Sequence, residues 1–129
     1  MVERKIKLET ALLAKKCGFN WRVDFAFWTS RDPEETQLTF PLQYSDYRND
    51  CIEYHSAPTQ SLLQKWLRDE RKVVVSVQPI DSWNSWSYSI LMQDEYCPFF
   101  EPEYDKFNEF KTYEDALEEG LKVALELLM

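Results

Sequence analysis

The sequence has very little glycine, a single histidine and no long apolar run. Only Gly18 and Gly120 occur among its 129 residues, so no glycine-rich loop is present to cradle a phosphate group. No window approaches the roughly 18 apolar residues of a membrane-spanning helix. The charged start at residues 1–7 is not followed by the apolar stretch of a signal peptide. We therefore expect a cytoplasmic protein that neither spans nor binds a membrane.

Cysteine is also sparse, and its arrangement is not that of a disulfide framework or a zinc site. Cys17, Cys51 and Cys97 are odd in number and widely spaced, and no two of them form a CxxC pair. The lone His55 does not complete a zinc-ligand set with them at any common spacing. We expect reduced thiols that mostly behave as small core residues, with no bound metal and no cofactor.

Negative charge is abundant but confined to one part of the chain. Residues 1–93 hold 12 acidic and 12 basic residues, whereas residues 94–129 hold 11 acidic and 3 basic ones, which accounts for the whole net charge of −8. An acidic surface of this kind repels the phosphates of nucleic acids and of anionic membranes. Direct binding of DNA or RNA is therefore not expected.

Apolar spacing and turn residues predict three helices and four strands. Gly18 is expected as the left-handed residue that ends the first helix, Pro58 as the first residue of the second, and Thr112 as the start of a capping box before the third. Residues 41–57 are expected to form a loop that covers a sheet edge or continues the second strand. The predicted helices are 8–17, 58–71 and 113–129, and the predicted strands are 23–28, 36–40, 72–78 and 86–92.

The predicted order is therefore α-β-β-α-β-β-α, and residues 1–129 are expected to form a single domain. Short connections within each pair of strands favour antiparallel pairing. The expected fold is α+β, a two-layer domain with an antiparallel four-stranded sheet and the helices packed on one face. Ala116, Gly120 and Ala124 repeat at every fourth position of the last helix. A close approach to a sheet or to a partner helix would explain a glycine in the middle of that helix.

Several segments resemble a family of small uncharacterised proteins from Bacteroides-type gut bacteria and their phages or prophages. The segment 56–77, which contains a Pro58–Arg68 string, carries the resemblance most specifically. Weaker likenesses lie in residues 11–19, 86–90 and 112–121, so the match extends over most of the chain. The resemblance implies a bacterial or phage origin and an intracellular location. It implies no chemistry and no functional residues.

Cys51 and His55 are the candidates for catalysis. Histidine titrates near neutral pH, and a nearby imidazole can activate a thiolate as a nucleophile. No orienting group is identifiable from the sequence, so a histidine at the surface or at the approach to the second helix, with no catalytic role, is the favoured interpretation. The aromatic residues Trp83, Trp86 and Tyr88 are assigned to core packing, because no Arg or Lys lies among residues 79–105 to support base stacking.

The irregular segment 94–111 combines acidic and aromatic residues and is the candidate docking surface for another protein. The leading hypothesis is a non-catalytic protein-interaction module of a bacterium or its mobile elements, which binds an unidentified protein partner. One alternative is a homodimer formed through the Ala116–Gly120–Ala124 stripe or through an unpaired sheet edge. Another is a small enzyme that uses Cys51 or His55. The predicted partner-binding residues are Phe99, Phe100, Glu101, Glu103, Tyr104 and Asp105.

Overall fold

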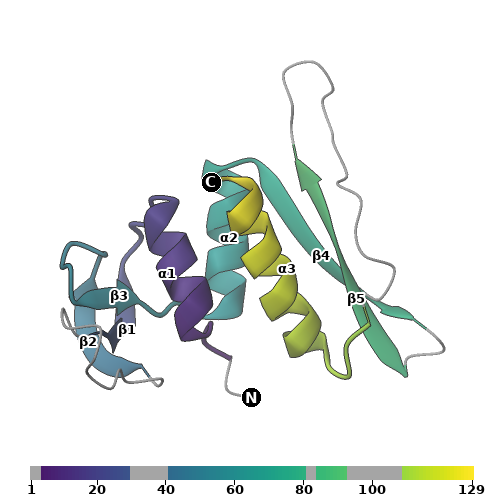
Figure 1. Cartoon of the computed structure of the whole chain (residues 1–129), viewed down its shortest axis with the longest axis horizontal. Coiled ribbons are helices and arrows are strands. Elements are labelled where there is room, and N and C mark those ends of the chain that lie inside the picture. Colours follow the sequence, from purple (N-terminus) through teal and green to yellow (C-terminus); the bar gives the residue numbers. More distant parts are fainter. Residues whose placement is uncertain (1–3, 30–40, 81–83, 93–108) are drawn as a thin grey trace.

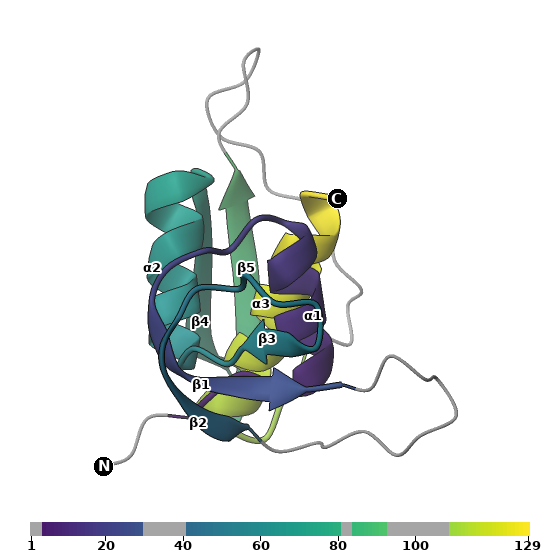
Figure 2. The same ribbon diagram turned by 90° about the vertical axis from the view of Figure 1, so that its left-hand side faces the viewer.

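The computed structural model describes residues 4–29, 41–80, 84–92 and 109–129 of the chain. Within these residues a layer of three helices lies between two antiparallel sheets (Figures 1 and 2). In chain order the elements are α1 (Leu8–Lys16), β1 (Val23–Trp28), β2 (Leu42–Tyr47), β3 (Tyr54–Ser56), α2 (Gln60–Glu70), β4 (Val73–Ile80), β5 (Ser85–Met92) and α3 (Tyr113–Leu127). The two sheets face opposite sides of the helix layer.

The α+β class and the antiparallel pairing are confirmed, but the prediction of one four-stranded sheet is wrong for the described strands. These strands form a three-stranded sheet in the order β2-β1-β3 and a separate two-stranded hairpin, β4-β5. Helix α2 carries the chain from one sheet to the other, so the expected two layers become three (Figure 1). The predicted strand at 36–40 lies outside the described residues.

Of the two expectations for residues 41–57, a loop is wrong where β2 and β3 lie in this interval, whereas a continuation of the second strand fits β2, which pairs with β1. Strand β3 has only three residues, and its two buried ones, His55 and Ser56, are polar. Strand β2 pairs with β1 through a shift in register, and Asp46 within it has a φ of 64°. A short polar strand and a bulged strand lack the regular alternation by which strands are recognised in a sequence.

Gly18 ends α1 as predicted, with a φ of 92°. Its N–H donates to the carbonyl of Lys15 at 3.1 Å, and the N–H of Phe19 donates to the carbonyl of Ala14 at 3.0 Å. This pair of bonds is the Schellman motif, which satisfies helix carbonyls that would otherwise lack partners. Phe19 is 1% exposed and meets the Trp66 ring edge-on at 5.4 Å between centroids, so the end of α1 packs against α2.

Helix α2 begins two residues later than predicted. Thr59 is its N-cap, and the Thr59 hydroxyl accepts the N–H of Leu62 at 3.3 Å. Pro58 therefore precedes the cap and is not the first helical residue. Its carbonyl instead accepts the N–H of Ile6 at 3.0 Å, and the N–H of Gln60 donates to the carbonyl of Arg4 at 2.8 Å. The chain start is thus paired with the start of α2.

The hairpin β4-β5 is longer than predicted, since Pro79 and Ile80 belong to β4 and not to the turn. Pro79 is opposite Trp86 in the ladder. Both backbone groups of Trp86 bond to Phe110 at 2.8 Å, on the side of β5 away from β4. Pro79 therefore occupies a position where no N–H is needed between the two strands, which is where a strand tolerates proline.

Gly120 is the point at which α3 lies closest to the hairpin. A Cβ atom at this position would lie 2.9 Å from Cγ1 of Val75 and 3.1 Å from Cβ and Cγ of Tyr88. The prediction of a close approach to a sheet is therefore confirmed. Ala116 and Ala124 are fully buried as well, so the small-residue stripe of α3 is covered within the chain and is not open to a second copy.

The N-terminal ends of all three helices meet at the buried carboxylate of Glu118, which is 6% exposed. Its Oε2 accepts the hydroxyl of Thr10 at 2.5 Å and the backbone N–H of Lys7, the N-cap of α1, at 3.1 Å. Its Oε1 accepts the side-chain amide of Gln60 at 3.1 Å. A carboxylate withdrawn from water is tolerated only with such donors, so this cluster fixes α1, α2 and α3 relative to one another.

We predict that Gly120→Ala destabilises the protein by about 1–3 kcal/mol, because the new methyl group would be forced into Val75 and Tyr88. At an exposed mid-helix position the same change would stabilise by about 1 kcal/mol. Urea unfolding measures the difference. In a Val75→Ala background the cost should fall, since the closest atom is then gone. A gain in stability from Gly120→Ala alone would contradict the close approach.

We predict that Glu118→Gln lowers the free energy of unfolding by about 1–3 kcal/mol. The carboxylate accepts three donors, whereas the carboxamide has only one oxygen, so its NH₂ group must face at least one donor. Glu126→Gln on the same helix is the matched control, because Glu126 is exposed, and its effect should stay within about 0.5 kcal/mol. Equal effects of the two variants on the free energy of unfolding would contradict a stabilising role of the Glu118 hydrogen bonds.

Candidate functional site

His55 lies on β3 and is held as a buried neutral imidazole, so the expectation of a surface histidine is wrong. It is 6% exposed, and its Nε2 lies 2.7 Å from the hydroxyl of Thr29. Burial, and secondarily the positive charge of Lys15, lower the pKa of His55 from 6.5 to about 4. Its Nδ1 has no hydrogen-bond partner among the described residues. An imidazole with so low a pKa is a poor base at neutral pH.

Cys51 is half-buried in the turn before β3, and its backbone has a structural role. The ammonium of Lys15 donates to the carbonyls of Cys51 and Tyr54, and the hydroxyl of Tyr47 donates to the carbonyl of Tyr54 at 2.5 Å. No hydrogen bond joins the Cys51 thiol to His55, although both residues are described. The geometry therefore does not support a Cys51–His55 nucleophilic pair.

The remaining cysteines divide between the core and the undescribed part of the chain. Cys17 is 7% exposed, and its thiol donates to the carbonyl of Leu125 at 3.3 Å. Burial raises the pKa of the Cys17 thiol, which disfavours the reactive thiolate. This agrees with the expectation of a small core residue. Cys97 lies outside the described residues.

The six predicted partner-binding residues, Phe99, Phe100, Glu101, Glu103, Tyr104 and Asp105, also lie outside the described residues. The structure does describe where their segment is attached. The chain leaves β5 at Met92 and is paired with the same strand again at Phe110. The segment between them is therefore anchored at both ends on β5.

Aromatic rings surround the second of these anchors. The Phe110 ring lies 6.0 Å from that of Tyr88, and the Tyr113 ring meets that of Trp86 edge-on at 5.6 Å. Tyr88 is 8% exposed. These contacts agree with the assignment of Trp86 and Tyr88 to packing; Trp83 lies outside the described residues. The rings hold α3 and the end of segment 94–111 against the hairpin.

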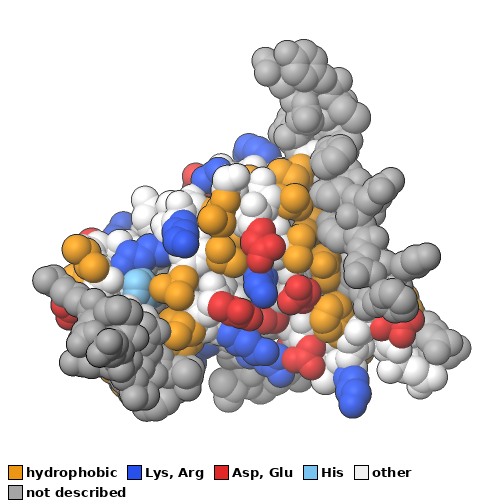
Figure 3. All heavy atoms as spheres, in the orientation of Figure 1, with side chains coloured by type: hydrophobic (Ala, Val, Ile, Leu, Met, Phe, Trp, Pro, Cys, Tyr) orange, Lys and Arg blue, Asp and Glu red, His pale blue; other side chains and the backbone are white. Residues whose placement is uncertain are grey.

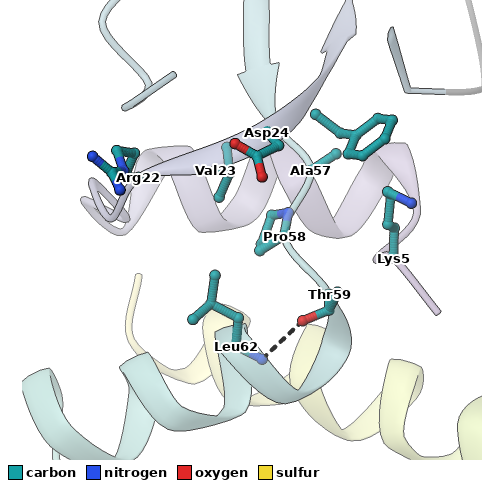
Figure 4. A pocket seen from close by; sticks show the side chains of 9 residues that line it. Lys5, Arg22, Val23, Asp24, Ala57, Pro58, Thr59 and Leu62 are labelled. Carbon is teal, nitrogen blue, oxygen red and sulfur yellow. Dashed lines mark hydrogen bonds between the residues drawn. The ribbon is translucent and has the colours of Figure 1, made fainter. Parts of the chain in front are cut away.

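A cleft opens where the chain passes from β3 to α2. The pairing of this segment with β1 reaches Ala57, whose N–H donates to the carbonyl of Phe25 at 2.8 Å. The next residue, Pro58, makes no hydrogen bond to β1; its carbonyl accepts the N–H of Ile6 at 3.0 Å instead, and the two segments diverge from here (Figure 4). The space between them is a cleft of about 330 Å³ (Figure 4). Val23, Ala57 and Pro58 are buried along it, and Leu62 of α2 closes its lower side.

Three charged side chains line the exposed part of the cleft. Arg22 and Asp24 are exposed and flank the buried Val23 at the start of β1. Figure 4 shows the Asp24 carboxylate directed towards Pro58, with Arg22 and Lys5 at opposite ends. The Lys5 ammonium lies over the Phe25 ring, 4.0 Å from its centroid. The sequence analysis did not predict this site. Two charged residues on either side of an apolar strand residue, as in Arg22-Val23-Asp24, are a pattern that could have indicated it.

The described residues form neither a metal-binding cluster nor a membrane-spanning helix. No three His, Cys, Asp or Glu side chains of these residues gather in a way that could hold a metal ion. None of the helices described has both the length and the apolar character needed to cross a membrane. The cleft and the anchored segment 94–111 are therefore the features from which a function can be argued.

We predict that the imidazole of His55 titrates near pH 4 in the folded protein. The chain has one histidine, so its NMR signal is unambiguous. In the unfolded chain the His55 imidazole has a pKa near 6.5, so it binds a proton more readily than in the folded protein. The contribution of neutral His55 to the free energy of unfolding is therefore complete above pH 6.5 and is lost as the pH falls towards 4. His55→Gln should lack this component of the pH dependence. A folded-state titration near pH 6.5 would contradict the buried neutral state.

Comparison with known proteins identifies no relative. No family model matches the chain, and no curated protein and no solved structure matches it significantly. The resemblance to small proteins of Bacteroides-type bacteria and their phages therefore stays a prediction from the sequence.

Proposed function

We propose that the protein is a non-catalytic protein-interaction module of a bacterium or its mobile elements, acts in the cytoplasm, and docks its partner through residues 94–111. The observation that carries the proposal is the attachment of this segment to β5, from Met92 at one end to Phe110 at the other. A segment fixed at both ends loses less conformational entropy on binding than a free tail does.

The helix that follows the segment carries charge of the same sign. Glu114, Asp115 and Glu119 are half-buried and Glu126 is exposed on α3. Figure 3 shows acidic side chains gathered over this helix. The only basic residue of α3, Lys122, lies 3.6 Å from the carboxylate of Glu9. An acidic surface beside an acidic segment favours a partner with a basic face, such as a protein that itself binds nucleic acid.

Aromatic and acidic residues would have different roles in this docking. Phe99, Phe100 and Tyr104 would supply the apolar contacts that dominate the binding energy of most protein interfaces. Glu101, Glu103 and Asp105 would accelerate encounter with the basic partner and set its orientation. Because charges act mainly on association rate and aromatic contacts mainly on dissociation rate, the two contributions can be measured separately.

We predict that replacing Glu101, Glu103 and Asp105 together by Lys abolishes capture of the partner from a bacterial lysate by the tagged protein. For the purified partner, the association rate constant should fall by about tenfold or more at low salt. Replacing Phe99, Phe100 and Tyr104 by Ser should raise the dissociation rate instead. Quantitative mass spectrometry identifies the partner, and surface plasmon resonance measures both rates.

The matched control replaces three exposed acidic residues of the neutral part of the chain, Asp50, Asp69 and Glu70, by Lys. It makes the same change in net charge, so its capture of the partner should resemble that of the unmodified protein. Undiminished capture by both segment variants would overturn the proposal. Equal loss with the control would show that net charge, and not the segment, governs binding.

A further inference from the structure

We propose that the cleft between β1 and the start of α2 binds a free α-amino acid with an apolar side chain. This would be a second function, separate from docking through residues 94–111. The cleft is lined by different residues, at the three-stranded sheet, whereas segment 94–111 is anchored on β5. The two proposals can therefore fail independently.

Arg22 and Asp24 are placed to meet the two charges of an amino acid. Asp24 lies in β1 and Arg22 directly precedes this strand, so their side chains leave the same side of the extended chain from Cα atoms about 6.6 Å apart. The ammonium and carboxylate groups of an α-amino acid are about 3 Å apart, and each hydrogen bond adds just under 3 Å. One ligand can therefore place its carboxylate at Arg22 and its ammonium at Asp24.

Arg22 has donors to offer such a ligand. Its Nε is bonded to Asp46 at 2.7 Å, but the two side chains of this pair are 62% and 67% exposed. An ion pair so exposed adds little to stability and is readily exchanged. The guanidinium also carries four further N–H groups on its Nη atoms, which suit a carboxylate.

The apolar side of the cleft selects for the side chain. Pro58, Val23 and Ala57 are buried along it, and Leu62 is half-buried opposite the Asp24 carboxylate (Figure 4). The cleft volume of about 330 Å³ is at the lower end of the usual range for ligand pockets, which suits a molecule as small as leucine. Contact with these residues removes the ligand's aliphatic surface from water.

The balance of charge argues against simpler ligands. A phosphate or other purely anionic ligand would have to approach the Asp24 carboxylate, which faces into the cleft. A plain amine would meet Arg22 at one end and Lys5 at the other. Lys5 and Arg22 lie on either side of Asp24, and Asp46 is paired with Arg22 beside the cleft, so the site offers both signs of charge and is complementary to a ligand that carries both.

The experiment is an NMR titration of the full chain with L-leucine, monitored through the backbone amides of Asp24, Ala57 and Leu62. Three probes each remove one element of recognition: 4-methylpentanoate lacks the ammonium, 3-methylbutan-1-amine lacks the carboxylate, and glycine lacks the side chain. Leucine should shift these amides selectively. Each probe should bind at least tenfold more weakly than leucine.

Variants test the two charges directly. Asp24→Asn and Arg22→Gln should each weaken leucine binding at least tenfold, and the amide spectra show whether each variant is folded. The controls are Asp69→Asn and Arg48→Gln, which change exposed residues outside the cleft and should leave binding unaltered. The proposal is overturned if leucine shifts none of the three amides up to its solubility limit. It is equally overturned if 4-methylpentanoate or the amine binds as tightly as leucine.

Discussion

The buried carboxylate of Glu118 is the interaction on which the rest of the structure depends. It accepts donors from α1 and α2 while belonging to α3, so among the described residues it is the one side chain bonded to all three helices of the central layer. Arg4 adds a second connection nearby, through its 2.9 Å salt bridge to Asp115 and its backbone bond to Gln60. The Arg4 bond lowers the pKa of the Asp115 carboxyl. The helix layer is therefore positioned by polar contacts at its N-terminal ends and by apolar packing along its length.

This arrangement also sets the position of the cleft. The N–H of Gln60 bonds to the chain start while its side chain bonds to Glu118, so the first turn of α2 is fixed at both its backbone and its side chain. Thr59, just before it, pairs with Lys5 in an isolated bridge. Leu62 and Lys5, on two sides of the cleft, are thereby held relative to each other. A binding site built this way is preformed, which reduces the entropic cost of taking up a ligand.

Much of the local structure could be predicted from the sequence, because its signals are chemical and short in range. Gly18 predicted the end of α1, and Gly120 predicted a close approach of α3 to a sheet or to a partner helix, of which the structure has the sheet. The error at Pro58 arose between two adjacent residues that can both begin a helix; the Thr59 hydroxyl is the actual cap. The separation into two sheets was not predictable in this way, because the sequence pattern of a hairpin does not show whether one of its strands pairs with a strand of another hairpin.

The candidate site was harder to predict than the fold, for a physical reason. Cys51 and His55 were catalytic candidates because of their residue types alone. Reactivity, however, depends on burial and on neighbouring charge, and burial makes His55 a weak base. The charges of the cleft come from the chain start and from the beginning of β1, segments that are far apart in sequence. Their proximity is a consequence of the backbone bonds between Arg4–Ile6 and Pro58–Gln60, together with the bond from the Ala57 N–H to the Phe25 carbonyl of β1. No local pattern contains that information.

The hairpin β4-β5 shows how the helix layer protects a sheet of only two strands, which would be marginally stable alone. Val73 and Val75 in β4 are each only 1% exposed, so α2 and α3 shield this part of the strand.

The outer edge of β4 is covered as well. The side chain of Gln64 on α2 donates to the carbonyl of Val75 at 2.6 Å and satisfies a backbone group at this edge. Shielding an edge with a helix is one of the ways in which proteins prevent strand addition. Pairing of β4 with a second copy is therefore disfavoured over Val73–Val75, and the other edge already binds Phe110. The hairpin thus acts as a support that holds α3 and both ends of segment 94–111, and recognition is left to the surfaces that it positions.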